Sequence, residues 1–246
     1  MDCASDYNVD ESLLGLGEFI LLEILSEMEI PQDAQQFLIL CRKTFKLLIH
    51  PRYAKIIQSI FEIRPIFIIN EDWQGRSDQN KFIHSDQDGF CTIAMNPVIR
   101  EGIVKIQVIF ENSTYHNRMI GIADASCCFA AGNWPTDQGN NQKTVKYYSD
   151  GNLSHITYSK VNQKYADGQR VAVEVDMTTV PRKATFFVDD IEQPNFVIDI
   201  PEAVRFWTCT LNKSSSFVVI NFEKLIKSTS QGVYGSKALQ WGKEWK

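Results

Sequence analysis

The segment spanning residues 168–223 constrains the fold of this chain more than any other part of it. It contains four runs in which apolar and polar residues alternate between turn-forming residues, at 168–177, 183–190, 204–211 and 216–223. In the first run Val171 and Val173 share one face, whereas Glu174 lies on the other. Because successive side chains of a strand point to opposite faces, the pattern predicts an antiparallel sheet with one buried face.

Strand-like composition begins at Pro65 and continues to the end of this segment. Further strands are expected over residues 65–70, 102–111, 118–125, 145–148 and 155–158. The run 102–111 alternates best, with Val104, Ile106, Val108 and Phe110 on its apolar face. Many short strands between turn signals are typical of a β-sandwich. The predicted fold class is therefore mainly β, an antiparallel two-sheet sandwich preceded by a small all-α region.

The N-terminal part of the chain predicts helices. Apolar residues recur at helical spacing over 18–29, and Pro31 ends this run. A second helix begins either at Pro31 or after Asp33, which starts a capping box, and it is expected to run to His50. A third helix is expected over residues 52–63.

Charge and periodicity divide the chain into four parts. Residues 1–33 contain nine acidic side chains and neither Lys nor Arg, and residues 1–12 are expected to be disordered. Residues 13–64 form the helical module, 65–226 the sandwich and 227–246 a polar C-terminal tail of uncertain order.

Composition excludes several classes of function. The net charge of −5 gives no reason to expect a nucleic-acid partner. The apolar run 13–25 contains Glu18 and Glu23 and lacks a basic flank, so neither a signal peptide nor a membrane partner is expected. None of the six cysteines forms a Cys-x-x-Cys pair, which favours buried thiols in a reducing, cytoplasmic compartment.

Catalytic motifs are also missing from the sequence. There is no Gly-x-Ser-x-Gly elbow, phosphate-binding loop or His-Glu-x-x-His motif. The neighbours His84, Ser85 and Asp86 are triad residue types, but adjacent residues cannot reach one another as a triad does. Asp86 to Gly89 resembles the start of a calcium loop but lacks the later ligands. A protein that is not an enzyme, with no cofactor and no metal, is expected.

Particular stretches of the strand region resemble the SPRY family, over roughly Asn70 to Leu225. They are Gly121-Ile122-Ala123-Asp124, Lys146 to Gly151, Gly168 to Asp176, and Thr185 to Asp190. Two positions depart from the family pattern. Gln169 stands where the family has Asp, and Asp189-Asp190 stands where it has Asn-Gly. A two-residue type I′ turn needs positive φ at both central positions, so the turn here is expected to be longer or of another type.

The SPRY resemblance implies a bent antiparallel two-sheet sandwich. It also implies a binding module whose partners dock on loops at one end or edge of the sandwich. By position, the candidate partner-binding residues are Tyr115, His116, Asn117, Arg118, Trp134, Asp189 and Asp190. Trp, Tyr and Arg often carry the binding energy of interfaces. Trp134 alternatively packs down as a loop anchor, because Trp is usually largely buried.

The helical region, residues 17–60, resembles a degenerate F-box. Its features are two amphipathic helices on either side of Pro31, and the stretch Leu40 to Phe45, which is similar to a Val-Cys-Arg-x-Phe element. The resemblance implies that an adaptor of a cullin–RING ubiquitin ligase would bind through Leu21, Leu22, Ile24, Leu25 and Pro31. The alternatives are a helical cap on the sandwich and a small dimerisation unit.

The functional expectation is a non-catalytic protein that binds a protein or peptide through SPRY loops, with the further hypothesis that it is a substrate receptor of a ubiquitin ligase. The alternative is an intracellular lectin-like module. In that interpretation Trp134, Tyr115 and Asn117 would stack on a sugar and form hydrogen bonds with it.

Overall fold

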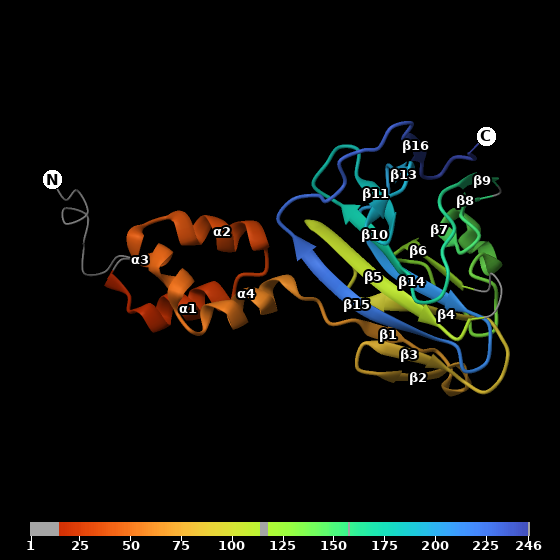
Figure 1. Ribbon diagram of the computed structural model, residues 1–246, viewed down its shortest axis with the longest axis horizontal. Helices are drawn as coiled ribbons and strands as arrows, with labels where there is room; N and C mark the ends of the chain where they lie inside the picture. The colour runs from red at the N-terminus through yellow and green to blue at the C-terminus, as the bar shows by residue number, and fades with distance from the viewer. Residues whose placement is uncertain (1–14, 114–117, 157, 246) are drawn as a thin grey trace. The chain divides into compact units, whose positions relative to one another are not determined.

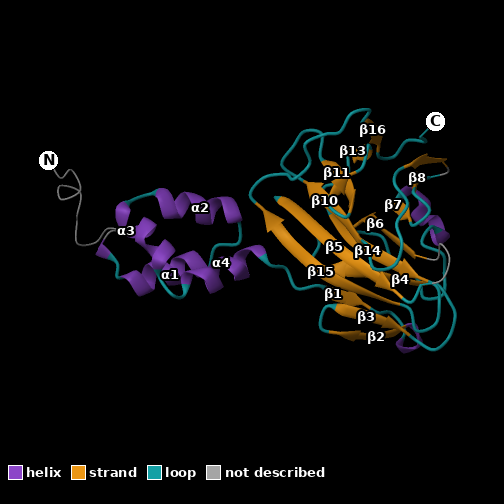
Figure 2. Cartoon of the chain, in the orientation of Figure 1, coloured by secondary structure: helices purple, strands orange, loops and turns teal. Residues whose placement is uncertain are grey.

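The computed structural model describes residues 15–113, 118–156 and 158–245. The chain divides between Ile63 and Arg64 into two compact units. The first unit is helical and the second is built mainly from strands (Figure 2). The prediction of a mainly β chain with a small all-α N-terminal region is confirmed.

The helical unit packs around side chains of its own. Its elements are α1 (Glu18–Ser26), α2 (Pro31–Ile39), α3 (Arg42–Phe45), the 3-10 helix η2 (Lys46–Ile49) and α4 (Tyr53–Phe61). Helix α2 begins at Pro31, whose fixed φ and missing N–H suit the first helical position. Leu21, Leu22 and Leu25 of α1 form a buried core with residues of α2, η2 and α4.

The second helix does not run to His50 as predicted, because the helix is interrupted at Cys41. Cys41 is extended, with φ −158° and ψ 170°. The Thr44 hydroxyl donates to the Cys41 carbonyl (2.9 Å) and accepts the Cys41 N–H (3.2 Å). Such a side chain offers the backbone an alternative to helical hydrogen bonds. This interruption leaves Leu40 63 % exposed.

The strands form two sheets that lie face to face (Figure 1). In order, the first sheet contains β1 (Ile66–Ile68), β4 (Cys91–Asn96), β14 (Val204–Thr210), β6 (Arg118–Asp124), β7 (Thr144–Tyr148), β8 (Asn152–His155) and β9 (Tyr158–Val161). The second contains β16 (Lys237–Gln240), β13 (Asn195–Ile198), β11 (Lys183–Val188), β10 (Arg170–Asp176), β5 (Ile103–Glu111), β15 (Ser216–Leu225), β3 (Lys81–His84) and β2 (Gly75–Asp78), with β12 (Ile191–Glu192) beside β11. Neighbouring strands are antiparallel except β13 and β16. Short 3-10 helices lie at η3 (Asp72–Gln74) and η4 (Asp137–Gln142).

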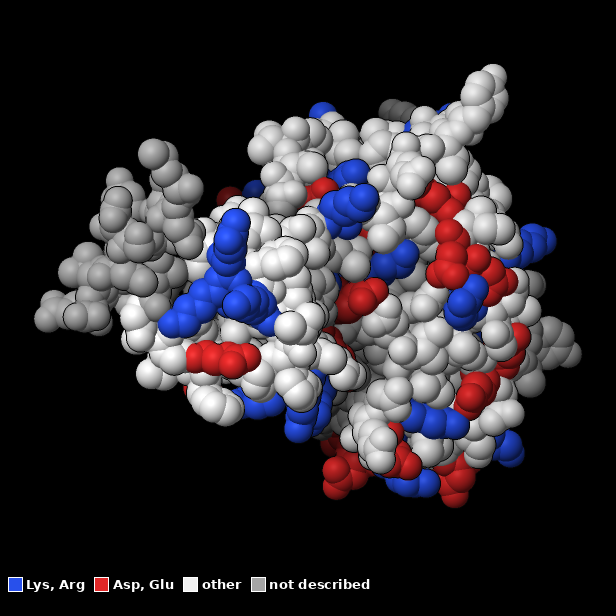
Figure 3. Space-filling model, turned by 60° about the vertical axis from the view of Figure 1, so that its left-hand side comes forward, with Lys and Arg blue, Asp and Glu red and all other residues white. Residues whose placement is uncertain are grey.

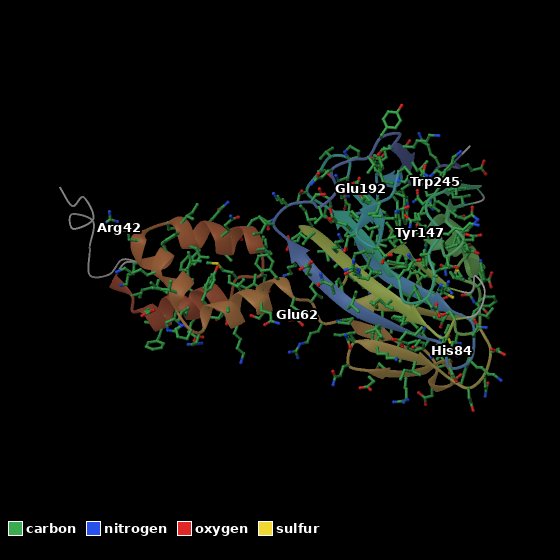
Figure 4. All side chains as sticks on the ribbon, viewed as in Figure 1. Arg42, Glu62, His84, Tyr147, Glu192 and Trp245 are labelled. Atoms are coloured by element: carbon green, nitrogen blue, oxygen red, sulfur yellow. The ribbon has the colours of Figure 1, made fainter. Side chains whose placement is uncertain are left out.

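The main core lies between the two sheets. The predicted apolar face of β5 is buried as expected, from Val104 to Phe110. Aromatic side chains meet across the sheets: Tyr147 of β7 contacts Phe186 of β11, with ring centroids 5.5 Å apart. Figure 4 labels Tyr147 inside the sandwich.

The predicted strand over residues 155–158 is wrong. The chain turns after His155, and Ile156 has a positive φ of 56°. β8 and β9 then pair in antiparallel fashion, so that His155 faces Tyr158 across the ladder. The sequence pattern predicted one strand where the ends of two strands lie, because Ile156 is β-branched and gives no turn signal.

A long connection between β6 and β7 covers the outer face of the first sheet. Cys127 and Phe129 of this connection pack against Trp207 and Cys209 of β14. The Arg205 guanidinium holds the start of the connection by donating to the Ala125 carbonyl. The first sheet is therefore apolar on both faces over its central strands.

The C-terminal segment 226–236 lies on the outer face of the second sheet and is tied there by two carboxylates. Glu174 accepts hydrogen bonds from the Ser228 hydroxyl (2.6 Å) and from the Thr229 N–H (3.2 Å). Glu192 accepts from Ser230 Oγ (2.9 Å) and the Gln231 N–H (2.7 Å). Glu174, expected on the solvent face, is consequently only 1 % exposed. We call residues 226–236 the strap.

Beyond the strap the chain adds β16 to the edge of the second sheet and then reaches β8. Trp241 and Trp245 lie 4.9 Å and 5.4 Å from the His155 ring, centroid to centroid. His155 Nε2 accepts the Gly242 N–H at 2.8 Å, and burial lowers the pKa of His155. Figure 4 labels Trp245 and Glu192 near the side of the sheet where β13 and β16 lie. The stretch expected as a polar tail is thus part of the sandwich.

Candidate functional site: the loop end of the sandwich

One end of the sandwich gathers the described residues of the predicted partner-binding site. At this end β5 and β11 finish and β10 begins, because Val171 pairs with both Val108 and Val188. In the first sheet, Arg118 at the start of β6 pairs with the last residue of β14, beside the start of β4. We call this region the loop end. Tyr115, His116 and Asn117 lie outside the described residues.

Arg118 is buried at the loop end, where it joins loops of the two sheets. Its side chain is 6 % exposed, and Nη1 lies 3.0 Å from Asp167 Oδ1. Nη2 donates to the Tyr165 carbonyl at 3.2 Å. The other Asp167 oxygen accepts the Ser113 N–H at 2.7 Å. Arg118 therefore fixes the loop at residues 165–167 through an ion pair and a hydrogen bond.

The Asp189-Asp190 turn differs from the sequence-based expectation. Val188 pairs with Ile191, so the turn has two central residues, with φ of 49° at Asp189 and 65° at Asp190. Positive φ at both positions is what a type I′ turn requires, so the prediction of a longer or different turn is wrong. Asp tolerates this region better than most residues with a side chain.

Hydrogen bonds from the neighbouring strand stabilise this turn. The Asp189 carboxylate accepts hydrogen bonds from the backbone N–H of Arg170 (3.0 Å) and from the Gln169 side-chain amide (2.7 Å). These bonds hold the pKa of Asp189 below its usual range. Asp190 Oδ2 lies 2.7 Å from Arg170 Nη2 and Asp190 Oδ1 accepts Gln107 Nε2. The two departures from the family pattern, Gln169 and Asp189, are thus in contact. An Asp at 169 would repel Asp189, whereas the Gln169 amide donates to it.

Trp134 is both anchored and partly exposed. Its ring meets Phe90 edge-on at 4.7 Å and stacks on Tyr148 at 6.3 Å, centroid to centroid. The backbone N–H of Trp134 donates to Asp137 Oδ2 at 3.0 Å. Burial raises the pKa of the Tyr148 phenol to about 12. Trp134 is therefore packed against its neighbours, as the loop-anchor interpretation predicts. It is only half-buried, so part of it is accessible, as the binding interpretation requires.

A hollow beside Trp134 was missed by the sequence analysis. It has a volume of about 490 Å³ and is lined by Asn70, Glu71, Trp73, Cys128, Phe129, Ala130, Ala131 and Gln138. We call it the Trp73 hollow. The Asn70 amide donates to the Phe129 carbonyl and joins its two walls. A Trp between polar neighbours, Asp72 and Gln74, is the sequence signal that points to it.

The residues predicted to bind an adaptor lie mostly in the core of the helical unit. Leu21, Leu22, Leu25 and Pro31 are buried, and Ile24 is half-buried. The large apolar side chains exposed on this unit are Phe19, Ile20, Ile39, Leu40, Phe45, Leu48 and Ile49. Of these, Phe19 meets the His50 ring edge-on at 6.0 Å.

Charge and metal ligands are dispersed on the surface. In the view of Figure 3, acidic and basic side chains are interspersed among uncharged ones. Among the described residues, His, Cys, Asp and Glu side chains nowhere gather in a group of three that could hold a metal ion. Within that part of the chain, no helix is long and apolar enough to cross a membrane.

Comparisons with known proteins bear on the fold. No protein-family model matches the chain, and no curated protein matches its sequence. The structure is similar to the SPRY domain of human HERC1, with 12% identity, a TM-score of 0.44, and coverage of 65% of this chain and 94% of that one. It is also similar to the TRIM65 PSpry domain, with 10% identity, a TM-score of 0.50, and coverage of 70% and 95%. The likeness to the TRIM65 domain shows that the strand unit has the fold of a SPRY domain.

Proposed function

We propose that the sandwich is a non-catalytic binding module and that a protein or peptide partner docks at its loop end. The observation that carries the proposal is the pair Trp73 and Trp134, two partly exposed indoles held on either side of Phe90 and Gly132. Rigid, partly exposed aromatic side chains are the residues that most often dominate binding energy. Arg118 and the Asp189-Asp190 turn lie at the same end of the sandwich, where a rigid scaffold holds the loops.

A display library of random peptides selected on the full chain tests this proposal. Peptides selected on the natural chain are expected to bind Trp134→Ala at least about tenfold more weakly, since a partly buried interface Trp contributes strongly to affinity. Tyr234→Ala, which removes a fully exposed aromatic far along the chain in the strap, is the control and should bind unchanged. Equal binding by Trp134→Ala, with an unchanged melting temperature, would place the binding surface elsewhere.

We also propose that the helical unit binds the adaptor of a cullin–RING ubiquitin ligase, so that the protein presents its partner for ubiquitin transfer. The supporting observation is that Phe19 and Ile49 are both exposed near His50: Phe19 meets the His50 ring edge-on, and Ile49 precedes His50 in the chain. Ile49 is 86 % exposed, and it lines a hollow of about 340 Å³ with Glu18, Lys43, Lys46, His50 and Pro51. Exposed apolar patches mark protein–protein interaction sites.

Co-precipitation of the full chain with the adaptor subunit tests this second proposal. Ile49→Asp is expected to abolish capture, because a carboxylate would be buried without a partner in an apolar interface. Val180→Asp makes the same change at a fully exposed aliphatic residue of the sandwich and should leave capture intact. If the natural chain captures no adaptor, the ligase role is wrong and the binding function of the sandwich is unaffected.

A further inference from the structure

We propose that the Trp73 hollow binds the guanidinium group of an arginine side chain on a partner polypeptide. The inference rests on the proposed function, because it names the kind of side chain that the loop end accepts. Three features carry it: a braced aromatic wall, a carboxylate that forms no ion pair in the described part of the chain, and the absence of any basic residue among the eight described residues that line the hollow.

The aromatic wall is the indole of Trp73, which is 38 % exposed. Two glycines pack against its six-membered ring: a Cβ built on Gly89 or on Gly132 would lie 3.5 Å from ring carbons. The backbone of Phe90 pairs with Gly132, and the Phe90 ring contacts Trp134. The ring is therefore held before any ligand arrives, so little side-chain entropy is lost on binding. Trp is also the aromatic side chain that attracts cations most strongly.

The charge of the hollow is complementary to a cation. Glu71 is the single charged member of the lining, and Asp72 follows it on the exposed surface. In the described part of the chain, neither carboxylate forms an ion pair with Lys, Arg or His. The Glu71 carboxylate accepts the Gln74 backbone N–H and keeps further lone pairs for a ligand. A cation that stacks on Trp73 therefore meets this carboxylate and no competing positive charge within the lining.

The backbone at Gln138, another member of the lining, has an unusual conformation. Gln138 has a positive φ of 58° and is followed by Gly139 at 81°. A non-glycine residue in this region costs free energy, and such strain is found most often at binding sites. The turn brings Gln138, whose side-chain carbonyl is a hydrogen-bond acceptor, into the lining. The hydrogen bond from the Asn70 amide to the Phe129 carbonyl links two further members of the lining.

Arginine suits this site better than lysine for geometric reasons. A guanidinium is planar, so it can stack on the indole and at the same time direct N–H groups from its edge to a carboxylate and an amide oxygen. An ammonium group is more strongly hydrated and acts as a point charge. The hollow, with a volume of about 490 Å³, lies within the range of small-ligand pockets, which also accommodates the stem of the side chain.

Two peptide pools titrated against the full chain by fluorescence anisotropy test the inference. One pool of labelled hexapeptides carries arginine at a fixed position, and the other carries citrulline, which has the same shape without the charge. The arginine pool is expected to bind about tenfold more tightly, and its advantage should shrink as salt is raised. Glu71→Gln and Trp73→Ala should each remove most of that advantage, whereas Glu202→Gln, a change at another exposed carboxylate, should keep it.

Several outcomes would overturn the inference. Equal binding of the two pools or an arginine advantage that survives Glu71→Gln contradicts it. A third pool with lysine at the same position that binds more tightly than the arginine pool also contradicts it. Binding of neither pool at millimolar concentration contradicts it as well. The proposed function is judged separately, because peptides that bind the natural chain and lose affinity in Trp134→Ala support a partner site at the loop end whichever residue they carry.

Discussion

Replacing Gly121 by alanine is expected to lower the free energy of unfolding of the sandwich by about 3 kcal/mol or more. Gly121 lies in the middle of β6, between Trp207 of β14 and Lys146 of β7. A Cβ at this position would lie 1.9 Å from the Val145 carbonyl oxygen and 2.9 Å from the Trp207 ring. Neither neighbour can yield easily, since one is the backbone of a central strand and the other is fully buried.

Gly102→Ala provides the matched control. Gly102 has a positive φ of 71° but open space around it, so alanine there introduces backbone strain without a clash. We expect it to cost only about 1 kcal/mol. Urea denaturation followed by tryptophan fluorescence measures both variants. Because Gly121 itself has no positive φ, a loss in Gly121→Ala no larger than that in Gly102→Ala would show that the structure relieves the contact with Val145 and Trp207 at little cost.

Replacing Glu174 by alanine is expected to release the strap and to cost about 2–3 kcal/mol. The buried carboxylate accepts the hydroxyls of Ser228 and Thr229 together with the Thr229 N–H. Lys105 Nζ also donates to Thr229 Oγ1 at 3.0 Å, so the loss of Glu174 leaves this group of donors without its charged acceptor. Amide hydrogen exchange should show lost protection at Thr229 and Gly232, together with a lower melting temperature.

Glu223→Ala is the control for the Glu174 variant. Glu223 lies on the same sheet and accepts a hydrogen bond from Asn221 Nδ2 at 2.6 Å, within its own strand. Its removal should leave the protection of the strap unchanged. If Glu174→Ala and Glu223→Ala behave alike, the strap is held by β16 and the C-terminal tryptophans, and not by its carboxylates.

Strand periodicity predicted the sandwich well. β5 and β10 are buried on the apolar faces expected from their alternation, because a period of two can be read from neighbouring residues alone. The same reasoning was wrong where the outcome depended on contacts distant in the chain. Glu174 looked like a solvent-facing residue, yet the strap, more than fifty positions later, covers it.

The candidate site was predictable only in part. Trp134 and the Asp189-Asp190 turn were chosen as candidates by their positions in the SPRY pattern, and their role in binding stays a prediction. Trp73 was missed, since its place beside Phe129 results from a hydrogen bond between Asn70 and a segment nearly sixty residues later. Spacing along the chain carries no information about such a contact.

The sequence by itself determined the class of fold, because alternation, turn residues and helical spacing are local properties of the chain. The tertiary structure alone decided the details that matter for binding. It shows that two aspartates adopt a type I′ turn in which Gln169 and Arg170 donate to Asp189, and Gln107 donates to Asp190. It shows that Gly121 must lack a side chain because Trp207 and the Val145 carbonyl fill the space. These outcomes depend on which distant groups meet, and that is settled only when the two sheets pack together.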